Sequence, residues 1–190
     1  TIRYARGNQK HVSESRNFMS AGYAKVLIAR RFAPLRDNII AGPFTRLENI
    51  AATTFDETNH EIFVLDSVKN SIFVFNSELP GNVAPKRLFK SEALTGAVAI
   101  AVDPARGLLI VVLPRSISIY NRLAYSEGLR PEHSTEPISL LDESALGAGR
   151  ITGATYSSSS GQLELTDFEQ KQRIAVRVSP DGHILSAGSL

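Results

Sequence analysis

Cysteine and tryptophan are absent from this 190-residue chain, and methionine occurs only once. Without cysteine the chain can form no disulfide and has no thiolate to serve as a nucleophile or metal ligand. The four histidines are scattered along the sequence, at His11, His60, His133 and His183. A zinc site built from the usual cluster of His and Cys ligands is therefore not expected.

Long apolar runs are also missing. No segment approaches the roughly 18–20 consecutive apolar residues that a membrane-spanning helix requires, and no signal peptide is recognisable. The chain begins at Thr1 rather than Met, which is compatible with a processed product or a piece of a longer protein. Its shares of hydrophobic residues, 43%, and of charged residues, 21%, are those of an ordinary globular domain.

Basic residues are concentrated in the first 36 positions, which carry eight Lys or Arg and one acidic residue, Glu14. Two interpretations are open for the basic segment 1–22 and its continuation through Arg30 and Arg31. It is either a solvated N-terminus or an arm that docks on an acidic partner. Aromatic and basic residues do not alternate there as they do on single-strand nucleic-acid surfaces, so nucleic-acid binding is not favoured.

An internal repeat is the dominant feature of the remaining sequence. The segment 49–76 aligns with 96–121, and more faintly with 151–182. Matched pairs are Asp56 with Asp103 at a spacing of 47, Asn76 with Asn121 at 45, and Asp66 with Asp167 at 101. Self-similarity at a period in the forties indicates a repeat architecture.

Within each copy the local signals are those of short strands. The stretches "EIFVLD", "SIFVFN", "LLIVVL" and "SISIYN" are rich in β-branched and aromatic residues and are bounded by turn residues. "LLIVVL" is apolar on both faces, as expected of a strand buried between neighbouring sheets. Helical periodicity is scarce, and only 139–147 could hold a turn or two of helix.

The first strand of each copy is rich in small residues: "IAATTF", "AVAIAV" and "ITGATY". Small side chains suit strands that crowd together near a central axis, as the innermost strands of a β-propeller do. A period in the forties with about four strands per unit predicts an all-β propeller. The pattern, including "AVDP" and "GNVAPKR", resembles bacterial propeller repeats of the NHL and YVTN type. The resemblance implies six to eight blades for a closed ring and an exported, periplasmic or secreted protein.

The repeats predict one domain with units near 23–46, 47–93, 94–147 and 148–190. Three outcomes are open: a small closed propeller of four blades, a part of a larger one, or a homodimer in which two chains complete the ring. A lone open stack would leave two apolar sheet faces in water, which is unfavourable. We expect a closed or nearly closed ring, with the N-terminal segment adding a strand to the blade that contains 182–190.

Candidate chemistry is sparse. Lactonase-like propellers hold a divalent cation such as Ca²⁺ near the axis with carboxylates and amides, and Asn49, Asp56 and Asp103 are the candidates for such a site. Because Asp56 and Asp103 recur with the repeat, we expect them instead to bond their own downstream backbone amides. Asp66 and Asp167 are expected to cap turns in the same way. No catalytic residue is therefore predicted.

Binding remains as the favoured function. The loops that connect propeller blades are common recognition surfaces, and two connections are long here, 76–93 and 121–150. Phe89, Tyr125 and Arg130 lie in them and are of types enriched at interaction sites; packing beneath the loops is the alternative. The sequence predicts a non-enzymatic module without a cofactor that binds a protein or ligand. The alternatives are a metal-dependent hydrolase, or a structural subunit docked through its basic N-terminus.

Overall fold

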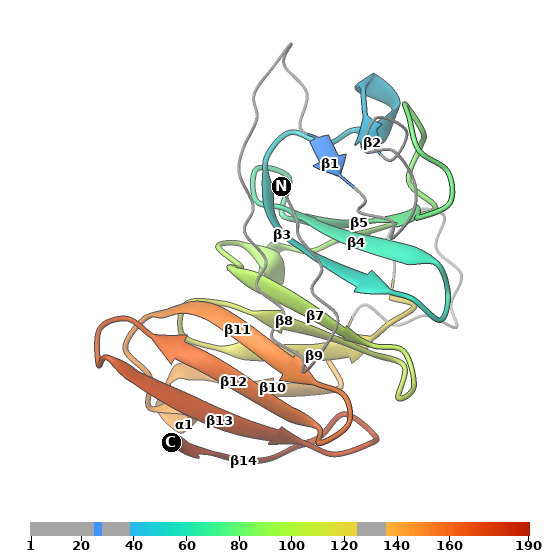
Figure 1. The fold of residues 1–190 in the computed structure, drawn as a ribbon. Helices are drawn as coiled ribbons and strands as arrows, with labels where there is room; N and C mark the ends of the chain where they lie inside the picture. Colours follow the sequence, from blue (N-terminus) through green and yellow to red (C-terminus); the bar gives the residue numbers. More distant parts are fainter. Residues whose placement is uncertain (1–24, 28–38, 125–135) are drawn as a thin grey trace.

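The computed structural model describes residues 25–27, 39–124 and 136–190. Three four-stranded antiparallel sheets are stacked one upon another (Figure 1). Sheet 1 contains β3 (Ile50–Asp56), β4 (Glu61–Asp66), β5 (Ser71–Asn76) and β6 (Arg87–Lys90). Sheet 2 contains β7 (Ala99–Asp103), β8 (Leu108–Val112), β9 (Ile117–Asn121) and β10 (Ser139–Leu141). Sheet 3 contains β11 (Ile151–Ser157), β12 (Gln162–Asp167), β13 (Gln172–Val178) and β14 (Ile184–Ser189).

The remaining elements are short. Strands β1 (Lys25–Leu27) and β2 (Ile39–Ala41) pair with each other beside sheet 1. The other described elements are two 3-10 turns, η2 (Pro43–Thr45) and η3 (Glu92–Leu94), and one helical turn, α1 (Glu143–Leu146). In every large sheet the strands follow chain order, so each sheet is a meander of neighbours.

The turns repeat as faithfully as the strands. The first hairpin turn of each sheet ends with a residue in the left-handed region: His60, Gly107 and Gly161, with φ of 52°, 69° and 67°. These positions are separated by the spacings of the sequence repeat. At Gly161 a side chain is excluded as well, because an added Cβ would lie 2.6 Å from the carbonyl oxygen of Val178. The strands and turns predicted for all three copies are thus confirmed.

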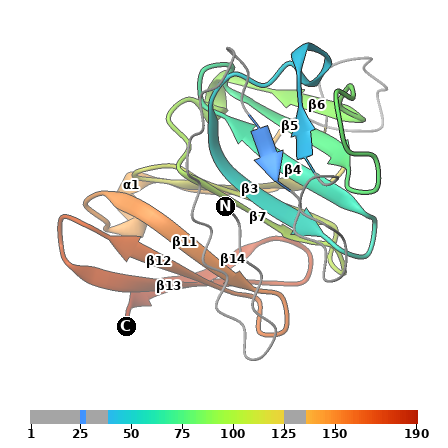
Figure 2. The same ribbon diagram turned by 45° about the horizontal axis from the view of Figure 1, so that its top comes forward.

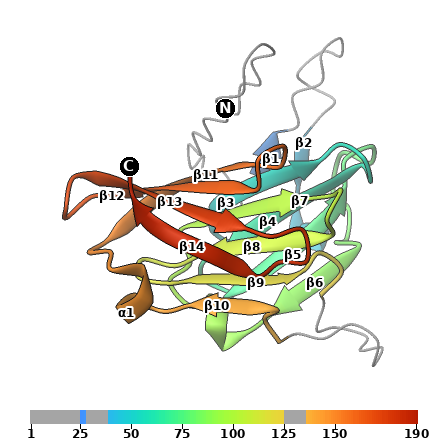
Figure 3. The same cartoon turned by 90° about the horizontal axis from the view of Figure 1, so that it is seen from below.

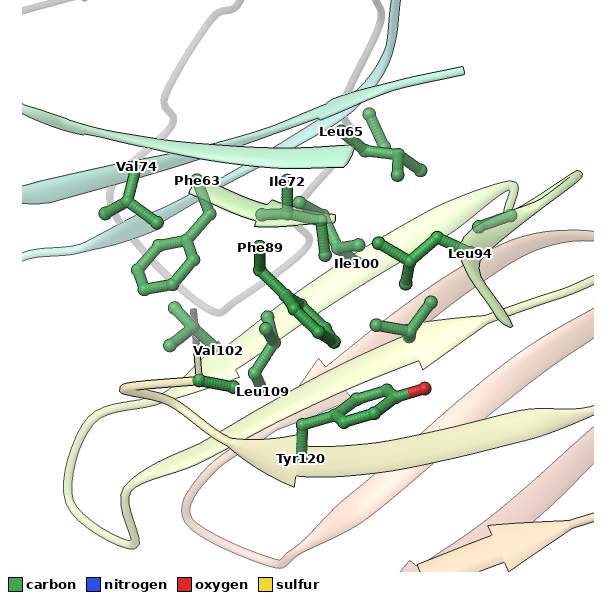
Figure 4. Close-up of a cluster of buried hydrophobic side chains, with 14 residues drawn as sticks. Phe63, Leu65, Ile72, Val74, Phe89, Leu94, Ile100, Val102, Leu109 and Tyr120 are labelled. Atoms are coloured by element: carbon green, nitrogen blue, oxygen red, sulfur yellow. The ribbon is translucent and has the colours of Figure 1, made fainter. Parts of the chain in front are cut away.

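Two apolar layers hold the stack together. Between sheets 1 and 2, side chains such as Phe63, Ile72 and Phe89 meet Leu109 and Tyr120 (Figure 4). Between sheets 2 and 3, the opposite face of β8 and β9 packs on β12 and β13. Sheet 2 is therefore buried on both faces, as the doubly apolar sequence of β8 predicts.

The first strands of the three sheets are neighbours. Strand β7 lies between β3 and β11 and contacts both (Figure 2). Their small side chains, Ala52 and Ala101 among them, permit this close approach. The arrangement is that of adjacent propeller blades whose innermost strands converge.

The two ends of the stack differ. The outer face of sheet 1 is apolar and is covered by Ile40, Leu47 and Val83. The outer face of sheet 3 is hydrophilic and exposed or half-buried: Thr155, Gln162, Glu164, Thr166, Arg173, Ala175, Arg177, Ser186 and Gly188. The expectation that an open stack would leave two apolar faces in water is therefore wrong for this end.

One further expectation needs correction. The segments 76–93 and 121–150 are not only connections, because each supplies the fourth strand of its sheet, β6 and β10. The turn of helix expected within 139–147 is confirmed as α1, which follows strand β10. Among the described strands, β14 pairs with β13 and β1 pairs with β2. The N-terminal segment 1–22 lies outside the described residues, so the ring closure expected between it and 182–190 stays a prediction.

Candidate functional site

Two buried aspartates anchor the loops that lead into sheets 1 and 3. Asp66 accepts backbone N–H bonds from Glu48 and Asn49 at 2.6 and 3.1 Å, and from Val68 and Lys69 at 3.1 Å each. One carboxylate oxygen thus accepts both bonds from the loop that enters the sheet, and the other accepts both bonds from the turn after β4. The expected turn-capping role is confirmed and extends to a second loop.

Asp167 repeats this arrangement in sheet 3. It accepts bonds from the backbone N–H groups of Gly149, Arg150, Glu169 and Gln170 at 2.7 to 3.1 Å. Burial alone would raise the pKa of Asp167, but the four donors together hold this pKa below its ordinary value. Both carboxylates are fully occupied by the backbone and are unavailable for catalysis.

A denser ionic cluster joins sheets 1 and 2. Glu61, at the start of β4 and only 2% exposed, accepts bonds from Lys86 Nζ at 2.7 Å and from both Nη atoms of Arg87 at 2.7 and 2.8 Å. Arg122, which follows β9 in the neighbouring sheet, donates through Nη1 to Glu61 at 2.6 Å and to Asp56 at 3.1 Å. The guanidinium of Arg122 therefore links the two sheets.

The protonation of Glu61 follows from these contacts. Burial alone would raise the pKa of Glu61, but the bonds and charges of Arg87 and Lys86 lower it to about 2. Arg87 also lies over the ring of Phe63, at 5.8 Å from its centroid, which favours the cation further. Glu61 remains ionised at every physiological pH and cannot act as a general acid there.

A second polar link joins sheets 2 and 3. The hydroxyl of Tyr156, in β11, donates to Asp103 Oδ2 at 2.8 Å. Arg106 donates through Nη1 to the Tyr156 hydroxyl at 2.9 Å and to Asp103 at 3.1 Å. Burial and the bond to Asp103 raise the pKa of Tyr156 to about 12, so the phenol stays neutral and acts as a structural donor.

The candidate metal ligands make other bonds: the side-chain amide of Asn49 donates to Ser67 Oγ at 2.7 Å, and the two aspartates hold turns. Asp56 and Asp103 each accept their own downstream backbone N–H, from Asn59 at 2.9 Å and Arg106 at 3.2 Å, as expected. Asn49 lies just before β3, whereas Asp56 ends that strand. Across residues 25–27, 39–124 and 136–190, no group of three His, Asp or Glu side chains is placed to hold a metal ion.

The predicted partner-binding residues have mixed outcomes. Phe89 is 1% exposed and meets Tyr120 edge to face with ring centroids 5.0 Å apart. The idea that it is an exposed contact residue is wrong, and the packing alternative is correct. Arg30, Arg31, Tyr125 and Arg130 lie outside the described residues, as does the basic segment 1–22, and their roles remain predictions.

Sequence reasoning missed the bonds between sheets, although two signals were present. Glu61 opens a buried strand at the position where the second copy has Leu108. Arg122 stands where the first copy has Ser77. In each of the two adjacent copies, a charged residue thus replaces an apolar or small one at a matched position. Two such replacements could have indicated that the charged residues contact each other.

Comparison with known proteins agrees with this fold. No protein-family model and no curated protein matches the sequence. Solved structures do resemble it: the WD40 domain of Toxoplasma gondii coronin (TM-score 0.58, 13% identity), Kluyveromyces lactis Hsv2 (0.55, 12%) and Saccharomyces cerevisiae Sqt1 (0.52, 11%). They cover 90%, 89% and 75% of this chain, and the chain spans 42%, 55% and 36% of theirs.

These similarities show a β-propeller fold, as the repeat predicted. The finer resemblance to NHL and YVTN repeats is not confirmed, and the number of blades and the closure of a ring also stay predictions. Among the described residues, no helix has both the length and the apolar character needed to cross a membrane.

Proposed function

We propose that this chain is a non-enzymatic β-propeller module that binds a protein partner. One observation carries the proposal: the buried carboxylates at the ends of the strands are all engaged in holding turns and sheets together. Asp66 and Asp167 serve backbone donors, and Asp56, Glu61 and Asp103 serve the links between sheets. A described buried carboxylate could serve as a nucleophile, general base or cation ligand only by giving up one of these bonds.

The surface supports the same conclusion. Eight large apolar side chains are exposed on the described surface: Phe44, Val68, Leu79, Ile138, Leu140, Phe168, Leu185 and Leu190. They lie on turns and outer strands, which are the parts of a propeller that reach solvent. The WD40 propellers with a similar fold also favour a role in protein interaction, and the fold alone favours no reaction.

We also propose that one chain is a self-contained stack. The apolar outer face of sheet 1 is covered by side chains of the same chain, and the outer face of sheet 3 is hydrophilic. Neither end presents a bare apolar sheet that a second copy would need to bury. This favours a monomer over the homodimeric ring.

Binding is tested by using the purified chain to capture partners from an extract of its native cells, followed by calorimetry with each purified candidate. We expect at least one candidate to bind saturably with one-to-one stoichiometry and a negative heat-capacity change, the mark of buried apolar surface. Failure of every candidate, together with metal-dependent turnover of a panel of lactones, would instead establish the hydrolase alternative.

A further inference from the structure

Among the described residues, no strand pairs with the outer edge of β14 in sheet 3, and this edge has the features of a docking site for an extended peptide. Resting on the proposed binding function, we propose that β14 binds an acidic segment of a protein partner, which adds to sheet 3 as a fifth strand. Strand addition of this kind draws its affinity from main-chain hydrogen bonds and its specificity from alternate side chains.

The backbone of β14 has the geometry that strand addition needs. The N–H of Leu190 donates to the carbonyl oxygen of Arg173 at 2.9 Å, and the register pairs Gly188 with Ala175. In an antiparallel ladder, bonded and non-bonded pairs alternate. The N–H and C=O groups of Ala187 and Ser189 therefore point away from β13. Figure 3 shows β14 as the last strand of sheet 3, beside β13.

The outer strands of the other two sheets are less suited to this role. Strand β10 has only three residues, and β6 carries Arg87 and Lys90. Short length and charge are two ways in which proteins protect sheet edges from pairing. Strand β14 has six residues with neither a charge nor a proline, and its only irregularity is the register shift near Leu185. It is the least protected of the three outer strands, β6, β10 and β14.

Charge selects the kind of segment that would bind. Arg173 and Arg177 project from β13 on the hydrophilic face, on the same side as Ser186 and Gly188. The β14 side chains on that face are small, so they leave room for the long guanidinium group of Arg177, which pairs with Ser186, to extend toward the edge. Two arginines four residues apart are separated by about 13 Å along a strand, which matches carboxylates at positions i and i+4 of an added strand.

These two guanidinium groups are poorly neutralised by the chain itself. The nearest carboxylate to Arg173 is that of Glu164, at 3.9 Å, with both side chains well exposed. Arg177 has no ion pair with any described residue. Exposed pairs at such distances contribute little, so both guanidinium groups can bind a partner's carboxylates, in bidentate fashion where geometry allows.

A second copy of the chain fits this edge less well. Antiparallel pairing of β14 with its own copy would place Arg173 and Arg177 of both chains on one continuous sheet face. The four guanidinium groups would then share one sheet face with no acidic side chain of β14 to compensate for their charge, which disfavours this pairing.

The probe is a blocked peptide of alternating Glu and Thr, labelled for fluorescence anisotropy, and the matched control peptide has Lys in place of Glu. We expect saturable binding of the Glu peptide only, and slower amide exchange at Ala187 and Ser189 in the complex. Ala187→Pro removes an outward N–H without breaking the bonds to β13, and we expect it to weaken binding at least tenfold while leaving the melting temperature nearly unchanged. Arg173→Glu with Arg177→Glu should have the same effect.

Four results would overturn the proposal. The Glu peptide could fail to bind, or it could bind the Ala187→Pro variant as tightly as the wild type, which would indicate charge attraction without strand addition. A doubled solution mass that Ala187→Pro abolishes would identify a second copy as the occupant. If a captured protein partner binds the Ala187→Pro and double arginine variants normally, the proposed function stands and this site falls.

Discussion

Val111→Asp is expected to abolish the folded state. Val111 lies in β8 with 0% exposure, in the apolar layer between sheets 1 and 2. The cluster of buried side chains that contains Val111 is apolar, so the new carboxylate would be buried among apolar neighbours. An unpaired buried charge costs several kcal/mol or more, which is comparable with the total stability of a domain, about 5–15 kcal/mol.

The measurement is the cooperative thermal transition, followed by circular dichroism. Val68→Asp is the matched control, because Val68 lies in a turn with 61% of its surface exposed. The control should melt within a few degrees of the wild type. If Val111→Asp also melted like the wild type, β8 would not be buried between two sheets and the stacked arrangement would be incorrect.

Glu61→Gln has the second largest expected effect, a loss of about 3–5 kcal/mol in the free energy of unfolding. The substitution keeps the shape of the side chain but removes the negative charge that faces Lys86, Arg87 and Arg122. Removing one partner of a buried ion pair costs this amount because the remaining charges stay desolvated. Urea denaturation measures the loss, and unchanged m-values would show that the unfolded state is the same.

Glu143→Gln is the control for charge removal. Glu143 is well exposed and pairs with Arg115, and an exposed pair contributes only about 0–1 kcal/mol. Equal losses in the two variants would contradict the structural role of Glu61. A Glu61→Leu, Arg122→Met double variant should recover part of the loss, because it removes charges on both sides of the link.

The Glu61→Gln variant should also differ from the wild type in its sensitivity to acid. The pKa of Glu61 is about 2 in the folded protein and 4.5 in its ordinary state. A lowered folded pKa gives stability that is complete above the ordinary value and is lost as pH falls toward the folded value. The wild type should therefore lose stability between about pH 4.5 and pH 2, and Glu61→Gln should lack that part of the dependence.

The fold was largely predictable because it is repeated. Matching spacings of 45 to 47 residues located two sheets, and the third followed from Leu163, Leu165 and Asp167 despite its weaker pattern. Short runs of β-branched residues between turn residues predict strands from local sequence alone, and the folded protein has strands at these positions. The turn roles of Asp56 and Asp103 were also predictable, since a structural turn recurs with its repeat.

Other features depend on tertiary contacts that no local pattern records. Phe89 has the composition of an interaction residue, but it belongs to β6 and is buried because that strand turns its aromatic ring toward Tyr120. The links through Arg122 and Tyr156 join residues 50 to 66 positions apart. The hydrophilic outer face of sheet 3 follows from alternation in β12 and β13, and it could have been read from "QLELTD" and "RIAVRV" before the structure.

Light scattering combined with a divalent-metal assay on the same sample tests the central claim most directly. The account describes a self-contained stack that binds a protein partner and needs no metal, so it predicts the mass of one chain and no stoichiometric metal. A dimer would contradict the self-contained stack and place the functional surface at a composite ring. A stoichiometric metal in either state would contradict the binding role and make the hydrolase the leading interpretation.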